Sequence, residues 1–252
     1  KALRKLQKEL PQSPSMEEKT SSPSQDEIAT LVNLYHSGQM AEAEQACREL
    51  LNTYPQTLVA INVLGATLQG QGKLQEAVQA YNKAIQLNPD YAVAHYNLGN
   101  TLQELGRSKD AEASYRKAIA LKSDFAEAHS NLGITLQELG RSKDAEASYR
   151  KAIALKPDYA EAHSNLGITL RELGKSKDAE ASYRKAIAVK PDYAEAHSNL
   201  GVTLQELGKL EDALVQHKKS FELVRGKNPV DPQHQSFRLI SKAKMKHDIE
   251  QF

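Results

Sequence analysis

Apolar and polar positions along the chain repeat with a period of 34 residues. Within each period, apolar residues return at steps of three and four, the spacing that gathers them on one face of an α-helix. One such face carries Ala179, Tyr183, Ala186 and Ile187. No stretch shows the alternation of apolar and polar residues that is typical of a half-buried strand. The pattern therefore predicts an all-α protein made of short helices.

The period divides the chain into six copies, and the middle copies are nearly identical. Ala126–Tyr159 and Ala160–Tyr193 differ at only three positions. The remaining copies are Ser24–Thr57, Leu58–Tyr91, Ala92–Phe125 and Ala194 to about Lys227. The outer copies diverge, as expected for end repeats that meet solvent. Positions are numbered from 1 to 34 within each copy.

Glycines recur at two positions of the repeat. Position 15 is Gly38, Gly72, Gly106, Gly140, Gly174 and Gly208. Because glycine readily adopts the left-handed conformation that ends many helices, a turn is expected there. Position 8 is Gly65, Gly99, Gly133, Gly167 and Gly201. Since a glycine inside a helix costs about 1 kcal/mol relative to alanine, its recurrence at position 8 indicates a place where two backbones approach closely.

Each copy is therefore predicted to form a helix, a turn, a second helix and a second turn. In the copy that starts at Ala160, the first helix is expected from about Asp158 to Leu173. Asp158 and Glu161 have the spacing of a capping box, and Ser176 is expected to cap the second helix. Proline at position 32 closes that second helix in four copies: Pro55, Pro89, Pro157 and Pro191.

Seven positions of the copies resemble the tetratricopeptide repeat (TPR): Leu at 7 and 11, Gly at 8, Ala at 20 and 27, Tyr at 24 and Pro at 32. The resemblance covers Ser24 to about Lys227. It implies a right-handed α-solenoid, a superhelix of about six helix-turn-helix units whose first helices line the concave side. Two positions depart from the family pattern. Position 24 is Cys47 and His217 in the outer copies, and position 4 is histidine instead of an aromatic residue in four copies: His95, His129, His163 and His197.

Two segments flank the repeats, which occupy residues 24–227. Residues 1–23 contain prolines and a serine cluster and are expected to form a flexible basic arm. This arm either frays or forms a short helix, with Leu3, Leu6 and Leu10 on one face, that docks on a neighbouring molecule. Residues 228–252 are expected to form a helix from about Gln233. That helix either caps the last repeat, as a solenoid requires, or leads into a further domain.

Charge and composition exclude several classes of protein. Among 252 residues, 33 Lys and Arg balance 32 Asp and Glu, whereas nucleic-acid binders are usually clearly basic, so no nucleic-acid partner is expected. No window holds the roughly 18 apolar residues of a membrane span, and the opening segment lacks the apolar core of a secretory signal. We therefore expect a cytoplasmic protein that binds no membrane. A single cysteine rules out a disulfide scaffold.

The sequence carries no pattern typical of catalysis or of cofactor binding. The position-4 histidines lie on successive helices, roughly 8–10 Å apart, too far for one zinc ion with bonds of about 2 Å. They are interpreted as packing residues with a hydrogen-bonding tip, and Cys47 as a small buried apolar residue. The carboxylates recur identically, whereas acid–base pairs need unlike environments. We therefore expect no enzyme activity, no cofactor and no metal site.

The surface of the first helices is the candidate for binding. If positions 7, 8 and 11 face the core, positions 2, 5, 6, 9, 12 and 13 face the groove. Position 6 is Asn97, Asn131, Asn165 and Asn199. An asparagine amide can bond both the C=O and the N–H of an extended peptide. The column resembles the asparagine ladder of O-linked N-acetylglucosamine transferases, which holds substrate peptides. The alternative is that these asparagines bond only within the scaffold.

Charged and polar residues surround the asparagine column. Position 13 is Glu104, Glu138, Glu172 and Glu206, and position 12 is Gln103, Gln137, Arg171 and Gln205. Position 2 adds glutamates that are expected to be capping-box partners: Glu127, Glu161 and Glu195. With Arg171 as the one cation among these positions, the groove should be net negative and favour an extended peptide that is basic or neutral.

The groove also differs between copies. Tyr96 and Asn100 are expected to form a distinctive pocket in the third copy. Chaperone-binding relatives hold a C-terminal carboxylate with a clamp of lysines and arginines. That clamp is missing, because position 5 is tyrosine in the third copy and serine in the next three.

Three hypotheses for function follow. The first is a protein-interaction scaffold, without enzyme activity, that binds an extended peptide along the groove. The second is the substrate-recognition region of a larger modifying enzyme, such as a glycosyltransferase. The third is a self-assembling scaffold in which the arm of one molecule occupies the groove of another.

Overall fold

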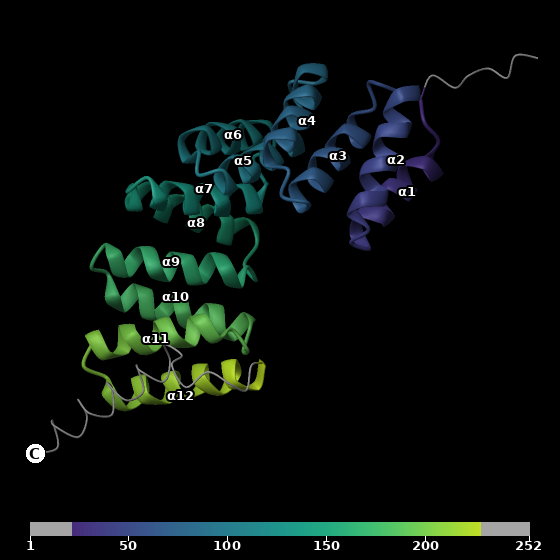
Figure 1. Ribbon diagram of the computed structural model, residues 1–252. Helices are drawn as coiled ribbons and strands as arrows, with labels where there is room; N and C mark the ends of the chain where they lie inside the picture. The colour runs from purple at the N-terminus through teal and green to yellow at the C-terminus, as the bar shows by residue number, and fades with distance from the viewer. Residues whose placement is uncertain (1–21, 228–252) are drawn as a thin grey trace, which may run out of the picture. The chain divides into compact units, whose positions relative to one another are not determined.

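The computed structural model describes residues 22–227, and over this range every regular element is an α-helix (Figure 1). The chain divides after Leu87 into two compact units. Unit 1 holds α1 (Gln25–His36), α2 (Met40–Thr53), α3 (Leu58–Gly70) and α4 (Leu74–Leu87). Unit 2 holds α5 (Ala92–Glu104), α6 (Ser108–Leu121), α7 (Ala126–Glu138), α8 (Ser142–Leu155), α9 (Ala160–Glu172), α10 (Ser176–Val189), α11 (Ala194–Glu206) and α12 (Leu210–Lys227). The predicted all-α fold of helix pairs is confirmed.

Both flanking predictions fall outside the part of the chain that the structure describes. Of the predicted N-terminal arm only Ser22 and Pro23 belong to it, and the predicted C-terminal helix begins after its end. Docking of the arm and capping of the last repeat therefore stay predictions.

The helices begin and end largely where the glycines and prolines predict. All six position-15 glycines have a positive φ, with Gly174 at 74°, which confirms the predicted turns. The two predicted caps are wrong. Tyr159 is the N-cap of α9 and Lys175 that of α10, and neither cap makes a side-chain hydrogen bond. Asp158 lies instead within the turn that Tyr159 N closes on Lys156 O at 3.1 Å, one residue before the cap.

A capping box does occur at α1. The Glu27 amide donates to Ser24 Oγ at 3.2 Å, and the Ser24 amide donates to Glu27 Oε2 at 2.8 Å. The reciprocal pair satisfies two backbone donors that the first turn of a helix leaves without partners.

An aromatic ring packs against each position-8 glycine. In the fourth copy, a Cβ on Gly133 would lie 2.6 Å from Cε1 of Tyr149, a fully buried side chain at position 24. The same pairing recurs as Gly65–Tyr81, Gly99–Tyr115, Gly167–Tyr183 and Gly201–His217. The predicted close approach is therefore real, but it joins a backbone to a side-chain ring of the second helix rather than two backbones.

The position-4 histidines tie each first helix to the turn before it. His163 Nε2 lies 2.9 Å from Pro157 O. The equivalent contacts are His95 to Pro89 O, His129 to Ser123 O and His197 to Pro191 O. This confirms their interpretation as packing residues with a hydrogen-bonding tip.

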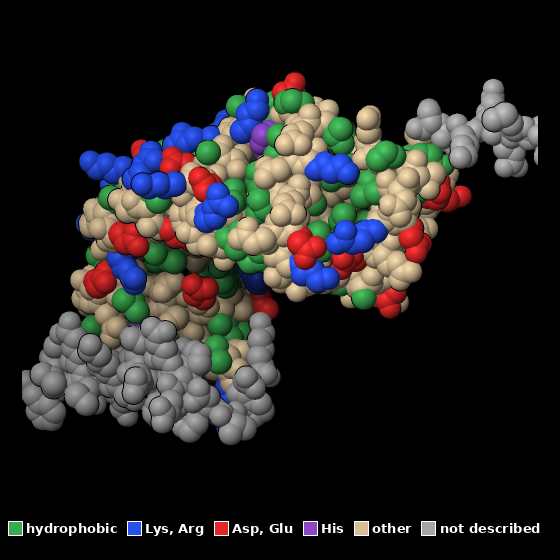
Figure 2. Space-filling view, turned by 45° about the horizontal axis from the view of Figure 1, so that its top comes forward, with side chains coloured by type: hydrophobic (Ala, Val, Ile, Leu, Met, Phe, Trp, Pro, Cys, Tyr) green, Lys and Arg blue, Asp and Glu red, His purple; other side chains and the backbone are tan. Residues whose placement is uncertain are grey.

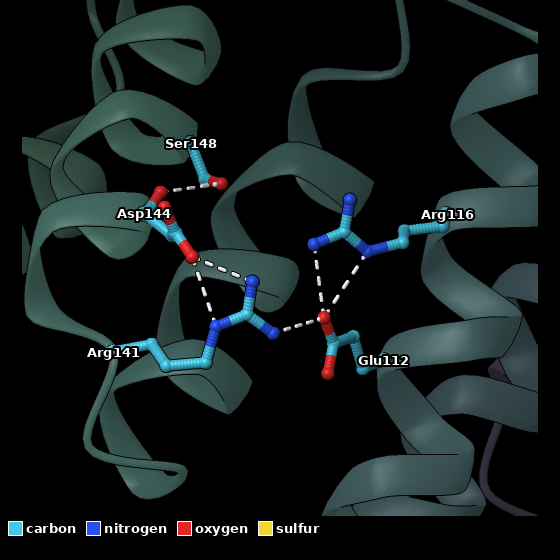
Figure 3. A network of polar contacts seen from close by, with 5 residues as sticks. All are labelled: Glu112, Arg116, Arg141, Asp144 and Ser148. Carbon is cyan, nitrogen blue, oxygen red and sulfur yellow. Dashed lines mark hydrogen bonds and ion pairs between the residues drawn. The ribbon is translucent and has the colours of Figure 1, made fainter.

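Ion pairs connect neighbouring repeats on the second helices, as Figure 3 shows for the third and fourth copies. Glu112 on α6 accepts from Arg116 Nη2 at 2.9 Å within its own helix and from Arg141 Nη1 at 2.6 Å in the next copy. Arg141 Nε also donates to Asp144 Oδ2 at 2.9 Å. Glutamates at the same position make the equivalent pairs elsewhere: Glu44 with Arg48 and Lys73, Glu146 with Arg150 and Lys175, and Glu180 with Arg184 and Lys209.

Adding one methyl group at position 8 is expected to destabilise the fold. Gly133→Ala gains about 1 kcal/mol of helix propensity but forces the Tyr149 ring out of a packed site, which costs typically 1–3 kcal/mol or more. We expect a net loss of up to about 2 kcal/mol, measured as the free energy of unfolding in urea by circular dichroism. In a Tyr149→Leu background the ring is gone, and the same substitution should be neutral or stabilising. An equal loss in both backgrounds would contradict the packing.

Acid is expected to weaken unit 1 through Glu44. Lys73, and after it Arg48, lowers the pKa of this carboxyl from 4.5 to about 2. Because the unfolded chain binds this proton more readily, the stabilisation is complete above the ordinary pKa and is lost as the pH falls toward 2. Glu44→Gln should cost about 1 kcal/mol near neutral pH and flatten the pH dependence of urea unfolding. Glu42→Gln, an exposed carboxyl on the same helix, is the control and should retain the wild-type slope.

Candidate functional site

All of the predicted peptide-binding residues lie on the first helices of the copies in unit 2: α5, α7, α9 and α11. These helices contact one another in series, α5 with α7, α7 with α9 and α9 with α11. Positions 7, 8 and 11 are buried, as predicted, whereas positions 6, 9, 12 and 13 are half-buried or exposed. We call these four positions of α5, α7, α9 and α11 the A-helix face.

Position 5 does not belong to this face throughout. Ser130 and Ser164 are buried, at 2% and 0% exposed, so the prediction that position 5 faces the groove is wrong for these two copies. Tyr96 and Ser198 are half-buried. The position-2 glutamates also differ from expectation, since they do not cap their helices: Glu127 pairs with Lys156 at 3.4 Å and Glu161 with Lys190 at 3.6 Å.

In the third and fourth copies the A-helix face is internally hydrogen-bonded. The Tyr115 hydroxyl lies 2.8 Å from Asn100 Oδ1 and 3.0 Å from Gln103 Oε1, and it donates its one proton between them. Asn131 Nδ2 donates to Asn100 Oδ1 at 2.9 Å and lies 3.2 Å from Tyr96 Oη. Tyr96 and Asn100 thus come together as predicted, but their polar atoms bond to the scaffold.

Two glutamates of position 13 accept from the copy before them. Glu138 accepts from Gln103 Nε2 at 3.0 Å and from Ser108 Oγ at 2.9 Å. Glu172 accepts from Gln137 Nε2 at 3.4 Å and from Ser142 Oγ at 3.2 Å. The glutamine at position 12 therefore makes two kinds of hydrogen bond in these copies. Its amide donates to the next glutamate, and its carbonyl accepts from the tyrosine beneath.

The fifth copy breaks this arrangement, because Arg171 stands at position 12. A guanidinium has no acceptor, so it cannot take the hydrogen bond that Gln137 Oε1 accepts from Tyr149 Oη at 2.6 Å in the copy before. The Tyr183 hydroxyl is buried and without a hydrogen-bond partner among residues 22–227. Burial raises the pKa of this phenol, so it stays protonated. Arg171 is half-buried, and its side chain makes no hydrogen bond or ion pair with the described residues.

The four asparagines of position 6 also differ from one another. All are half-buried. The Asn131 side chain is bonded to the scaffold, and Asn97 also has an interaction. The side-chain amides of Asn165 and Asn199 make no hydrogen bond to any described residue, although both asparagines accept through their backbone carbonyls. The amides that remain available to a ligand therefore lie in the fifth and sixth copies.

The net charge of the A-helix face is negative. Glu138, Glu172 and Glu206 are exposed and form no ion pair within the described part of the chain, and Arg171 is the one cation at positions 6, 9, 12 and 13 of α5, α7, α9 and α11. Figure 2 shows side chains of both charges interspersed on one side of the molecule.

The described His, Cys, Asp and Glu side chains bear on two further kinds of chemistry, metal binding and the reactivity of a thiol. Between residues 22 and 227 no three His, Cys, Asp or Glu side chains gather as a metal ion would require. Cys47 is fully buried, and burial raises the pKa of its thiol to about 12. It therefore stays protonated and packs as a small apolar residue, as predicted.

Four family models match the chain. A model described as "TPR repeat" matches residues 70–106, and three described as "Tetratricopeptide repeat" match residues 92–125, 124–192 and 182–215. The matches run without a gap from residue 70 to residue 215. The chain belongs to the tetratricopeptide-repeat family. A comparison with curated proteins finds no match.

Several solved structures resemble this TPR protein. MamA is 28% identical, with a TM-score of 0.62 over 66% of this chain and 98% of MamA. YrrB, described as a TPR protein with an unusual peptide-binding site, is 23% identical, with a TM-score of 0.64 over 80% of this chain and 99% of YrrB. PilF of Pseudomonas aeruginosa is 23% identical, with a TM-score of 0.66 over 77% of this chain and 86% of PilF. The last two matches show the shared fold.

The family and the fold together make this TPR protein a protein-interaction scaffold, because stacked repeats present long continuous surfaces to partners. None of the helices between residues 22 and 227 combines the length and apolar character needed to cross a bilayer.

Restoring glutamine at position 12 is expected to stabilise the TPR fold. Arg171→Gln supplies the acceptor that the buried Tyr183 hydroxyl lacks, which is worth about 1 kcal/mol. The gain should appear in the free energy of urea unfolding. In a Tyr183→Phe background there is no hydroxyl to satisfy, and the gain should vanish. A gain of equal size in both backgrounds would show that this hydrogen bond is not its cause.

Proposed function

We propose that this TPR protein binds an extended peptide segment along the A-helix face of unit 2 and carries out no chemistry on it. The observation that carries the proposal is the pair Asn165 and Asn199, whose half-buried side-chain amides have no described partner. Each amide offers a donor and an acceptor, the pair of groups that a peptide unit of the ligand complements.

The spacing of the asparagines suits an extended ligand. Equivalent residues of neighbouring packed helices are roughly 8–10 Å apart, and an extended chain rises about 3.3 Å per residue. One repeat therefore corresponds to about three peptide residues, so successive asparagines meet the backbone at regular intervals. Because the asparagines contact the peptide's backbone, they restrict the side chains of the ligand only weakly.

The charge of the face supports a basic or neutral ligand. Glu138, Glu172 and Glu206 are exposed and have no ion-pair partner among the described residues. A ligand rich in acidic residues would be repelled, and basic side chains beside the backbone contacts would be attracted.

Removing both available amides is expected to weaken peptide binding. Each lost hydrogen bond is worth about 0.5–1.5 kcal/mol, so the Asn165→Ala, Asn199→Ala double variant should bind about tenfold more weakly. The measurement is fluorescence anisotropy with labelled peptides of about 12 residues, made of Ser and Gly alone or with added Lys or Glu, at low and physiological salt.

Two controls make the test specific. Asn52→Ala removes an exposed asparagine of α2, a helix that does not contribute to the A-helix face, and should bind as the wild type does. Circular dichroism should show that the double variant keeps its fold, since neither amide bonds to the described scaffold. Absence of binding to every peptide, or equal binding by a folded double variant, would refute the proposal.

A further inference from the structure

Arg171 is a cation whose guanidinium has no hydrogen-bond or ion-pair partner among the described residues, and it shares a helix with one of the two available asparagines. It lies on α9 with Asn165, and α9 contacts α11, which carries Asn199. In the third and fourth copies, position 12 is a glutamine held from two sides, by the tyrosine beneath it and by the next glutamate. Arg171 has neither contact, so no hydrogen bond to the described residues has to break before it binds a ligand.

The chemistry of this side chain selects its ligand. A guanidinium presents a planar fork of donors that matches the two oxygens of a carboxylate. The neighbouring Tyr183 hydroxyl, fully buried and unpartnered, is a further donor that no described scaffold group uses. The Tyr183 side chain is fully buried, so the guanidinium of Arg171 is the donor that the A-helix face presents to a ligand in this copy.

The surrounding carboxylates limit which ligands fit. Glu172, Glu195 and Glu206 all act electrostatically on Tyr183, as Arg171 does, yet none of them pairs with Arg171. These three glutamates are exposed, so solvent and salt screen their repulsion of a ligand, whereas a direct contact with the half-buried Arg171 is screened less. One carboxylate is thus favoured here, and a run of acidic residues is not.

We propose that Arg171 forms a carboxylate-binding subsite that sets the register of the bound peptide. This inference rests on the proposed function. The ligand has a basic or neutral extended backbone with one carboxylate, from an acidic side chain or from the C-terminus, seated at the fifth copy between the contacts to Asn165 and Asn199. Arg171 makes the fifth copy unlike the sixth, which also offers an available asparagine amide but has glutamine at position 12.

A glutamate scan tests the subsite. Labelled peptides of about 12 residues made of Ser, Gly and Lys, with C-terminal amides, carry one Glu at each position in turn, and each has a matched Gln peptide. Wild-type protein should bind the Glu peptide about tenfold more tightly than its Gln partner at one position of the scan. Arg171→Gln should remove this preference, and the Gln peptides, which carry Lys, should bind to this variant at least as tightly as to the wild type, because the face has lost its one cation.

A second variant, which moves the arginine from the fifth copy to the fourth, is the matched control for Arg171→Gln. Gln137 occupies position 12 one copy earlier, and the fifth copy itself shows that the fold tolerates arginine there. In the Arg171→Gln, Gln137→Arg double variant, the preferred position of Glu should shift by about three residues, the peptide length that corresponds to one repeat. A free C-terminal acid tested against its amide, in peptides of different length without Glu, shows whether a terminal carboxylate is also accepted. Acceptance of either source supports the subsite.

The outcomes separate this inference from the proposed function. If the Gln peptides bind and are weakened by the asparagine substitutions, the proposed function stands. A scan with no preferred position, or a preference that survives Arg171→Gln, then overturns the carboxylate subsite alone. If no peptide binds, both proposals fail.

Discussion

Five of the six repeats, the second to the sixth, depend on one contact, the aromatic ring of position 24 packed on the position-8 glycine of the same copy. Tyr149 is fully buried, and its ring occupies the space where a Cβ on Gly133 would lie. Glycine is therefore retained in the middle of a helix despite its cost of about 1 kcal/mol relative to alanine. The contact sets how closely the second helix lies on the first. That distance in turn decides which positions of the first helix are buried and which remain on the A-helix face.

The same ring connects the core to the surface. Its hydroxyl reaches the A-helix face and needs an acceptor there, which glutamine at position 12 supplies. A single change at that position, from Gln137 to Arg171 in the next copy, leaves the Tyr183 hydroxyl unpartnered and at the same time creates a cation with no described partner. The proposed carboxylate subsite thus coincides with a place where the fold lacks one buried hydrogen bond, and proteins often give up stability at functional sites.

Neighbouring repeats are joined by contacts that repeat less strictly. The second helices share ion pairs such as Arg141 with Glu112, and the first helices share hydrogen bonds such as Gln103 with Glu138. Each contact reaches only the adjacent copy, so the stability of the stack is close to a sum of repeat and nearest-neighbour terms. The structural effect of a substitution should therefore be largely confined to its own copy and the adjacent ones. A variant of the fifth copy should leave the packing of the third copy unchanged.

The sequence by itself determined the helical period, the turns at the position-15 glycines and the inward face of the first helices, because these follow from local conformational preference and from spacing along one helix. It misplaced the helix caps, since Asp158 lies within the turn that Tyr159 N closes on Lys156 O, one residue before the cap. Only the tertiary structure decided which of the identical asparagines are available. Asn131 is bonded to residues 31 and 35 positions away, whereas Asn165 stands in the same sequence context without such neighbours. The fourth and fifth copies are nearly identical in sequence, but the copy before each of them is not, because Tyr96 and Asn100 of the third copy are replaced by Ser130 and Ile134 in the fourth.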